Sequence, residues 1–114
     1  MINIDLINEI QNLTKQLSNS LKQLRTNGIK LAEAEKEYKI AVNKKALLLR
    51  SEDMPVTLIN QVIYGYEDIA QLRFLRDSAE VVYKANLEAI MTIKLQIRII
   101  ENQIEREYNS NLPN

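Results

Sequence analysis

The sequence of 114 residues contains no histidine, no cysteine and no tryptophan. The lack of histidine and cysteine excludes thiol nucleophiles, disulfides, zinc fingers, histidine bases and most transition-metal sites. The serines have no histidine to activate them. Carboxylate pairs one helical turn apart, such as Asp77 with Glu80, could bind a divalent ion but are routine on solvated helix faces. We therefore expect no catalytic residue, no metal site and no cofactor, so that the protein is not an enzyme.

Glycine and proline are also scarce, with two of each. An all-β or α/β fold of this size would need more turn residues than that. Leucine, isoleucine, alanine, glutamate, lysine and glutamine are abundant instead, and this composition favours long helices. The sequence predicts an all-α protein with a single helical domain over residues 1–114.

Neither sign of charge is in excess, because 15 basic residues balance 15 acidic ones. A balanced chain does not point to nucleic acid or an anionic membrane as a partner. The sequence also has no run of about 18 apolar residues, and its N-terminus lacks the features of a signal peptide. We expect a cytoplasmic protein, in the host cell cytoplasm if it is encoded by a phage, with no membrane partner.

Apolar residues at spacings of three and four predict a first long helix over about residues 5–50, with Asp5 as its N-cap. Asn27-Gly28 is a turn signal, so this helix either continues through Gly28 or breaks there. The stripe begins with Leu6, Ile10, Leu13, Leu17, Leu21 and Leu24.

A short helix is predicted over about residues 56–64, in the connection between two long helices. Pro55 ends the first helix because proline disfavours helical geometry in the residue before it. Asp53 or Thr57 is expected to cap the short helix, and Gly65 is its natural C-terminal stop.

A second long helix is predicted over about residues 67–108, with the acidic residues Glu67 and Asp68 in its first turn. Asn86 falls within its apolar stripe, where it either fixes the register as a buried polar residue or faces solvent. The stripe runs through Ile69, Leu72, Leu75, Ala79, Val82, Ile90, Ile93, Ile97, Ile100 and Ile104.

The two long helices have similar lengths and a short connection, which predicts an antiparallel helical hairpin. The expected register places Arg50 near Glu67, Lys44 near Arg73, and Tyr38 near Ala79, with Met1 and Asn114 together at the far end.

The second long helix carries more apolar positions than one hairpin contact can cover. An oligomeric helical bundle is the economical way to cover them, so we expect a homo-oligomer, as a dimer or higher assembly. These additional positions are Val81, Leu87, Met91, Leu95 and Ile99.

Basic residues and tyrosines interleave around the connection, and they form the candidate ligand site. Arginine suits phosphate and tyrosine can stack on a base. The alternative is that the arginines pair with nearby acidic residues, namely Asp77, Glu80 and Glu67. In the ligand hypothesis, Arg73, Arg76 and Lys84 hold phosphates, Tyr64, Tyr66 or Tyr83 contact the base, and Thr57 adds a hydroxyl. Tyr38 and Tyr83 are expected at core or boundary positions, and Tyr64 and Tyr66 are expected to be exposed.

Several short runs carry a family resemblance: Met54-Pro55-Val56-Thr57-Leu58-Ile59, then Gly65, then the segment 70–80 with Leu72-Arg73-Phe74-Leu75-Arg76-Asp77, and Tyr83-Lys84-Ala85. Over about residues 33–106 the chain resembles a group of small helical proteins, with no assigned activity, of phages and prophages of Gram-positive bacteria, encoded near single-strand annealing genes. The resemblance implies a phage accessory or anti-defence protein.

These considerations favour a non-enzymatic phage or prophage oligomer that captures an anionic ligand near the connection, such as a nucleotide immune signal. The alternative is a coiled-coil interaction adaptor that acts with a phage or host protein in recombination or replication. Direct binding of single-stranded nucleic acid is disfavoured by the zero formal charge and the single phenylalanine.

Overall fold

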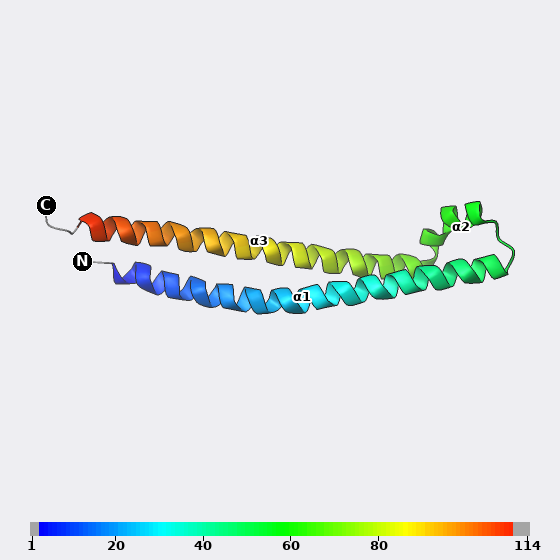
Figure 1. Cartoon of the computed structure of the whole chain (residues 1–114), viewed down its shortest axis with the longest axis horizontal. Coiled ribbons are helices and arrows are strands. Elements are labelled where there is room, and N and C mark those ends of the chain that lie inside the picture. The colour runs from blue at the N-terminus through cyan, green and yellow to red at the C-terminus, as the bar shows by residue number, and fades with distance from the viewer. Residues whose placement is uncertain (1–2, 111–114) are drawn as a thin grey trace. The chain divides into compact units, whose positions relative to one another are not determined.

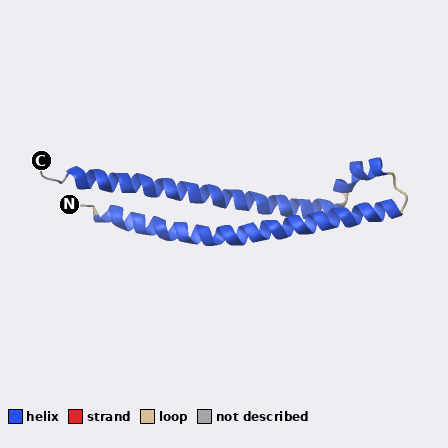
Figure 2. Cartoon of the chain, in the orientation of Figure 1, coloured by secondary structure: helices blue, strands red, loops and turns tan. Residues whose placement is uncertain are grey.

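The computed structural model describes residues 3–110 and shows an all-helical chain (Figure 1). The elements in order are α1 (Ile4–Ser51), α2 (Val56–Val62), the short 3-10 helix η1 (Ile63–Gly65) and α3 (Glu67–Ser110). No strand occurs within residues 3–110 (Figure 2). The all-α prediction is confirmed, as are the two long helices and the short helix between them.

The helices divide into two compact units. The terminal unit contains the described residues up to Arg25 and from Lys84 onward, and the connector unit contains Thr26–Tyr83. Within each unit, α1 and α3 run antiparallel to each other. The single-domain assignment stays a prediction, and the expected meeting of Met1 and Asn114 lies outside the described residues.

In the terminal unit the predicted apolar stripes form the core. Four buried residues pack together, and further stripe residues cover them from both helices. Asn86 is buried within this contact, where its Nδ2 donates a hydrogen bond to the carbonyl oxygen of Ser20 at 3.1 Å. Of the two alternatives for Asn86, the buried one is therefore observed. The core comprises Leu6, Leu13, Ile93 and Ile100, covered by Ile10, Leu17, Ile97 and Ile104.

Asn3 caps the start of α1, and the predicted cap at Asp5 was wrong. The side-chain Oδ1 of Asn3 accepts a hydrogen bond from the N–H of Asp5 at 2.9 Å. Its carbonyl oxygen also accepts one from the N–H of Leu6 at 3.2 Å. Asp5 lies in the first turn, where its charge complements the helix dipole. Asparagine and aspartate cap equally well, so the sequence pattern alone did not separate the two positions.

In the connector unit, the last turn of α1 packs against α2 and η1. Leu49, Ile59 and Ile63 are buried together, with Met54 and Tyr66 partly buried against them. The end of α1 is thus covered by the short helix that follows it. This cluster orders the connection as part of the unit's core.

The end of α1 is closed by Asp53, whose φ of 66° is left-handed. The N–H of Met54 donates to the carbonyl oxygen of Leu49, and the N–H of Asp53 donates to that of Arg50, each at 3.1 Å. This pair of bonds is the Schellman arrangement, in which glycine usually occupies the position of Asp53. Asp53 therefore ends α1.

The predicted N-caps of the short helix were wrong. The N-cap of α2 is Pro55, and no side chain of Asp53 or Thr57 bonds to the helix start. The helical segment ends at Gly65 as predicted, because α2 continues into η1 and the chain is extended at Tyr66. Gly65 has no positive φ, so this end is not a left-handed cap. The predicted start of α3, with acidic residues in its first turn, is confirmed.

α1 is continuous through Gly28. A Cβ atom on Gly28 would lie 3.4 Å from Cε2 of Tyr83, so the tyrosine ring rests against the α1 backbone at this point. Glycine is used here for close helix contact, and the alternative of a helix break is not observed.

Contacts in the connector unit differ from the expected register by about one helical turn. Arg76 lies over Tyr38, three residues before the expected Ala79. Lys45 pairs with Asp68 at 2.9 Å, whereas the sequence suggested that Arg50 would approach this end of α3. The last turn of α1, which bears Arg50, packs against α2 and η1 through Leu49.

Within the described residues, no helix is long and apolar enough to cross a membrane.

Candidate functional site

Two of the predicted ligand residues, Tyr64 and Arg76, line one pocket of the connector unit. The pocket has a volume of about 310 Å³ and opens to solvent. Its remaining lining comes from α1, with Tyr38, Lys39, Val42 and Asn43. It therefore combines two tyrosines, two cationic side chains and one amide, which we call the connector pocket.

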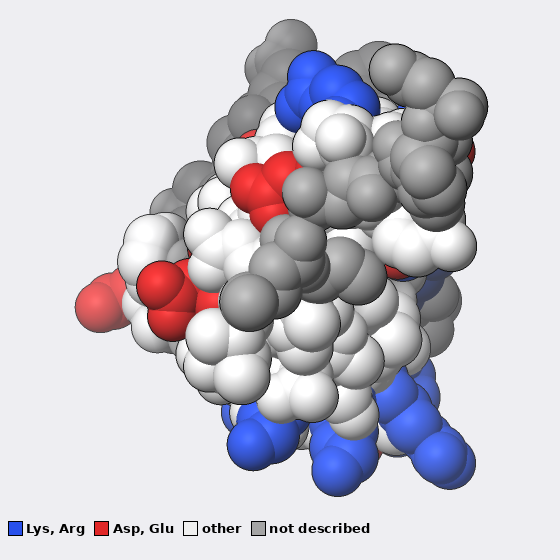
Figure 3. Space-filling model, turned by 90° about the vertical axis from the view of Figure 1, so that its left-hand side faces the viewer, with Lys and Arg blue, Asp and Glu red and all other residues white. Residues whose placement is uncertain are grey.

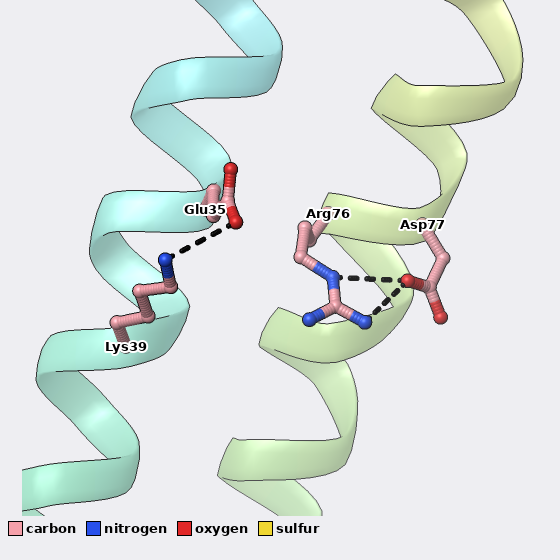
Figure 4. A network of polar contacts seen from close by, with 4 residues as sticks. All are labelled: Glu35, Lys39, Arg76 and Asp77. Carbon is pink, nitrogen blue, oxygen red and sulfur yellow. Dashed lines mark hydrogen bonds and ion pairs between the residues drawn. The ribbon is translucent and has the colours of Figure 1, made fainter.

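Arg76 extends from α3 towards α1 (Figure 4). Its guanidinium group lies over the ring of Tyr38. The guanidinium carbon is 4.5 Å from the ring centroid, a cation–π distance. Nε and Nη2 of Arg76 also donate to one carboxylate oxygen of Asp77, at 3.0 and 2.7 Å. The hydrogen bond with Asp77 raises the pKa of Arg76 above its already high value. Arg76 is thus held in place with its charge partly balanced.

The ligand prediction missed the four pocket residues of α1, and Tyr38 is the one among them that contacts Arg76. Its side chain is buried, with 6% exposure, as expected for a core position. It also lines the pocket and carries the Arg76 guanidinium. Tyr38 belongs to the apolar stripe of α1, and Arg76 lies on α3. Their contact could be predicted only with the correct alignment of the two helices.

Arg73 lies over the ring of Tyr64, with its guanidinium carbon 5.5 Å from the centroid. Both side chains are exposed, and Arg73 has no ion pair within residues 3–110. Tyr64 also lines the connector pocket, so Arg73 borders that pocket through its contact with Tyr64. A second guanidinium–tyrosine pair therefore lies at the same site.

Tyr66 belongs to a different cluster. It is half-buried against the Leu49 core, and Nζ of Lys45 lies 4.8 Å above its ring. Lys45 also pairs with Asp68, and the hydrogen bond from Lys45 lowers the pKa of Asp68 below its ordinary value. The expectation that Tyr66 would be exposed was wrong, because its ring covers the apolar cluster at the end of α1.

The remaining predicted residues are not brought into the connector pocket. Tyr83 is half-buried against Gly28, and Thr57 is exposed on the first turn of α2. Lys84 belongs to the terminal unit. The lining of the connector pocket includes none of the three.

The alternative of internal ion pairs is realised in part. Arg76 pairs with Asp77, and Glu35 pairs with Lys39 at 3.3 Å along α1 (Figure 4). Arg76 and Glu80 line a further pocket with Leu31 and Glu35. Arg76 therefore has acidic neighbours on one side and the tyrosine-lined pocket on the other.

In the described part of the chain, no three acidic side chains lie close enough together to hold a metal ion. Figure 3 shows basic and acidic side chains on the same face, separated by uncharged ones.

Comparison with protein-family models, curated proteins and solved structures found no match.

Proposed function

We propose that this chain is a non-catalytic binding protein that captures a small anionic ligand with a flat ring in the connector pocket. The observation that carries the proposal is the pair of guanidinium–tyrosine contacts at one pocket, Arg76 on Tyr38 and Arg73 on Tyr64. Tyrosine rings stack on flat ligands. One guanidinium group can donate two parallel hydrogen bonds to two oxygens of an anion. Nucleotides combine both features.

The volume of the pocket fits a ligand of this size. About 310 Å³ lies at the lower end of the range of small-molecule sites, which begins at roughly 300 Å³. The pocket suits the base and one phosphate of a nucleotide, and a larger ligand would extend over the exposed side chains around it. A compact ligand also agrees with the zero formal charge of the chain, because the positive charge is local.

Different residues have different roles in this proposal. Arg73, which has no ion pair within residues 3–110, contacts the phosphate. Tyr64 stacks on the ring of the ligand, and Asn43 offers an amide to its polar edge. Arg76 is held by its hydrogen bonds to Asp77 and packs on the ring of Tyr38, so that it keeps this ring in position. It also adds positive charge to the pocket wall.

The resemblance to phage and prophage proteins gives this binding a biological setting. A phage protein without catalytic groups that sequesters a nucleotide immune signal would protect the phage by lowering the free concentration of that signal. In this proposal the chain is an anti-defence sponge, and it acts by mass action alone.

Calorimetry of the full chain against cyclic mononucleotides and cyclic dinucleotides tests the proposal. We expect one member of this panel to bind and Arg73→Ala to weaken it about tenfold to a hundredfold, since a hydrogen bond to a charged group contributes about 1.5–3 kcal/mol. Tyr64→Ala should weaken binding by a similar factor through lost stacking. Arg106→Ala, an exposed arginine of the terminal unit, is the matched control. Absence of heat at high micromolar concentration with every panel member would refute the proposal.

A second candidate function is an interaction adaptor, and exposed apolar side chains favour it. Leu47 is 72% exposed, and Val56 and Phe74 are also exposed in the connector unit. Such residues are typical of a surface that a partner protein covers. Affinity capture from infected cells would then depend on Leu47 and Phe74 and be unaffected by Arg73→Ala.

A further inference from the structure

The face of α3 turned away from α1 carries unburied apolar residues in the terminal unit. Ile93 and Ile100 are buried against α1. Met91 and Leu95 lie on the other side of the helix, with 70% and 55% exposure. Leu87 and Ile99 are exposed on the flanks of the same face. Water is therefore in contact with a continuous apolar stripe on an ordered helix.

The stripe has the spacing of a second packing seam. Glu88, Met91, Leu95 and Arg98 follow one another at intervals of three, four and three residues. This is the spacing at which helix positions repeat along one face in a coiled coil. All four are exposed, and they lie opposite the buried Ile93 on the helix circumference. We call these four residues the outer seam.

The charges of the outer seam are placed symmetrically about its centre. The seam has a negative end at Glu88, a positive end at Arg98 and two apolar residues between them. A two-fold rotation perpendicular to the helix axis, which makes two copies antiparallel, places the negative end of one seam against the positive end of the other. The apolar centres of the two seams then face each other. The face is thus complementary to itself in the antiparallel direction only.

From this pattern we infer that the chain forms a two-fold symmetric dimer through the outer seam, with the α3 helices of the two copies antiparallel. Met91 packs against the partner's Leu95, and Glu88 pairs with the partner's Arg98, each contact occurring twice. A parallel dimer would instead place Glu88 against the partner's Glu88 and Arg98 against the partner's Arg98. Like charges in contact oppose association, so the antiparallel arrangement is favoured.

The occupant of the face is therefore a second copy of this chain. A two-fold interface uses the same patch on both subunits, and the outer seam meets that requirement in both its charges and its apolar centre. Leu87 and Ile99 enlarge the apolar area on the two flanks. This inference does not depend on ligand binding in the connector pocket, because the outer seam lies in the terminal unit.

Charge reversal tests the pairing. Sedimentation equilibrium of the full chain should show a dimer for the unaltered protein. Glu88→Arg alone and Arg98→Glu alone should each weaken the dimer by at least about tenfold, since they create like-charge contacts. The double variant Glu88→Arg/Arg98→Glu should recover the affinity. Lys15→Glu, a reversal on the exposed surface of α1, is the control and should change nothing.

A monomer at every concentration tested would overturn the inference, as would single reversals that leave the dimer intact. Circular dichroism of each variant separates loss of association from loss of folding, and all four seam positions are exposed, so the helix content should not change.

Cysteine cross-linking tests the direction, because the natural chain has no cysteine. A mixture of Met91→Cys and Leu95→Cys proteins should form the mixed disulfide faster than either protein alone forms its own. Faster cross-linking of Met91→Cys with itself would show a parallel pair and contradict the antiparallel dimer.

Discussion

Asp53 shows how one residue determines where a long helix ends. Its left-handed backbone lets the N–H groups of Asp53 and Met54 reach carbonyl oxygens of the last turn of α1. Residues with a Cβ adopt this conformation at a cost of roughly 1–2 kcal/mol, and aspartate tolerates it better than most. The chain therefore uses an acceptable residue where glycine is the best one.

Replacement of Asp53 tests this account of the helix end. Asp53→Gly should raise the free energy of unfolding by up to about 1 kcal/mol, because glycine has no steric penalty at positive φ. Asp53→Ala should lower it by about 0.5–1 kcal/mol. Urea unfolding followed by circular dichroism measures both variants. If the alanine variant were the more stable of the two, the left-handed closure of α1 would be wrong.

Gly28 makes a different contribution, since it lies inside a continuous helix. Gly28→Ala should stabilise the protein by about 0.5–1 kcal/mol, because a methyl group 3.4 Å from the Tyr83 ring is an ordinary contact and alanine favours helix. Gly28→Leu should destabilise by about 1–3 kcal/mol, since it must displace that ring. Thermal unfolding of the two variants provides the measurement. Equal stability of both would show that the close approach of Tyr83 is not maintained in solution.

Asp68 links stability to pH through its bond with Lys45. The bond with Lys45 lowers the pKa of Asp68 in the folded protein. The ionised carboxylate therefore contributes to the free energy of unfolding at neutral pH, and this contribution is lost as the pH falls below about 4. Asp68→Asn and Lys45→Met should each reduce the loss of stability between pH 7 and pH 3. The double variant should show no further reduction, because both changes remove one interaction. Additive effects would contradict a direct coupling between these residues.

At the scale of the elements, periodicity was sufficient to locate the helices but not to align them. The bounds of α1, α2 and α3 follow from local signals such as Pro55 and the acidic first turn of α3, and these were predicted within a few residues. The alignment of the two long helices depends on contacts between α1 and α3, such as Arg76 with Tyr38 and Lys45 with Asp68, and these residues lie far apart in the sequence. Leu21 and Leu75 were predicted to belong to the apolar stripes, but both are exposed. The apolar face of each long helix is wider than the strip of that face that contacts the other helix.

The candidate site was predictable to a similar extent. The sequence identified Tyr64, Arg73 and Arg76 from their chemistry and their closeness along the chain. It missed the role of Tyr38, which comes from α1 and meets Arg76 only through the register. It also included Tyr66, whose ring is required by the apolar cluster. Contacts between elements decided each of these differences.

In our proposals α3 has three roles, which use different sides or segments of one helix. One side packs on α1 in both units, through residues such as Ile93 and the Tyr83 ring. The segment bearing Arg73 and Arg76 places Arg76 in the lining of the connector pocket and Arg73 beside it, over the ring of Tyr64. The outer seam then leaves a face for a second copy. The charge-reversal pair on that seam therefore tests assembly without altering the pocket residues.

For the whole molecule, we propose that the connector unit binds the ligand and that the terminal unit associates with a second copy. A dimer would present two connector pockets, and the effective capacity for ligand would double per assembly without any change in the affinity of one pocket. Loss of dimerisation by Arg98→Glu should then leave the calorimetric affinity per chain unchanged, and loss of ligand binding by Arg73→Ala should leave the dimer intact.

Nuclear magnetic resonance of the tyrosine rings, during titration with the cyclic nucleotide panel, tests most directly whether the connector pocket captures a nucleotide. The chain has five tyrosines and no tryptophan, so the spectrum is simple to assign. If the pocket captures a nucleotide, we expect the resonances of Tyr38 and Tyr64 to shift and that of Tyr108, in the terminal unit, to stay unchanged. A titration in which no tyrosine shifts with any panel member, or in which Tyr108 shifts most, would contradict it.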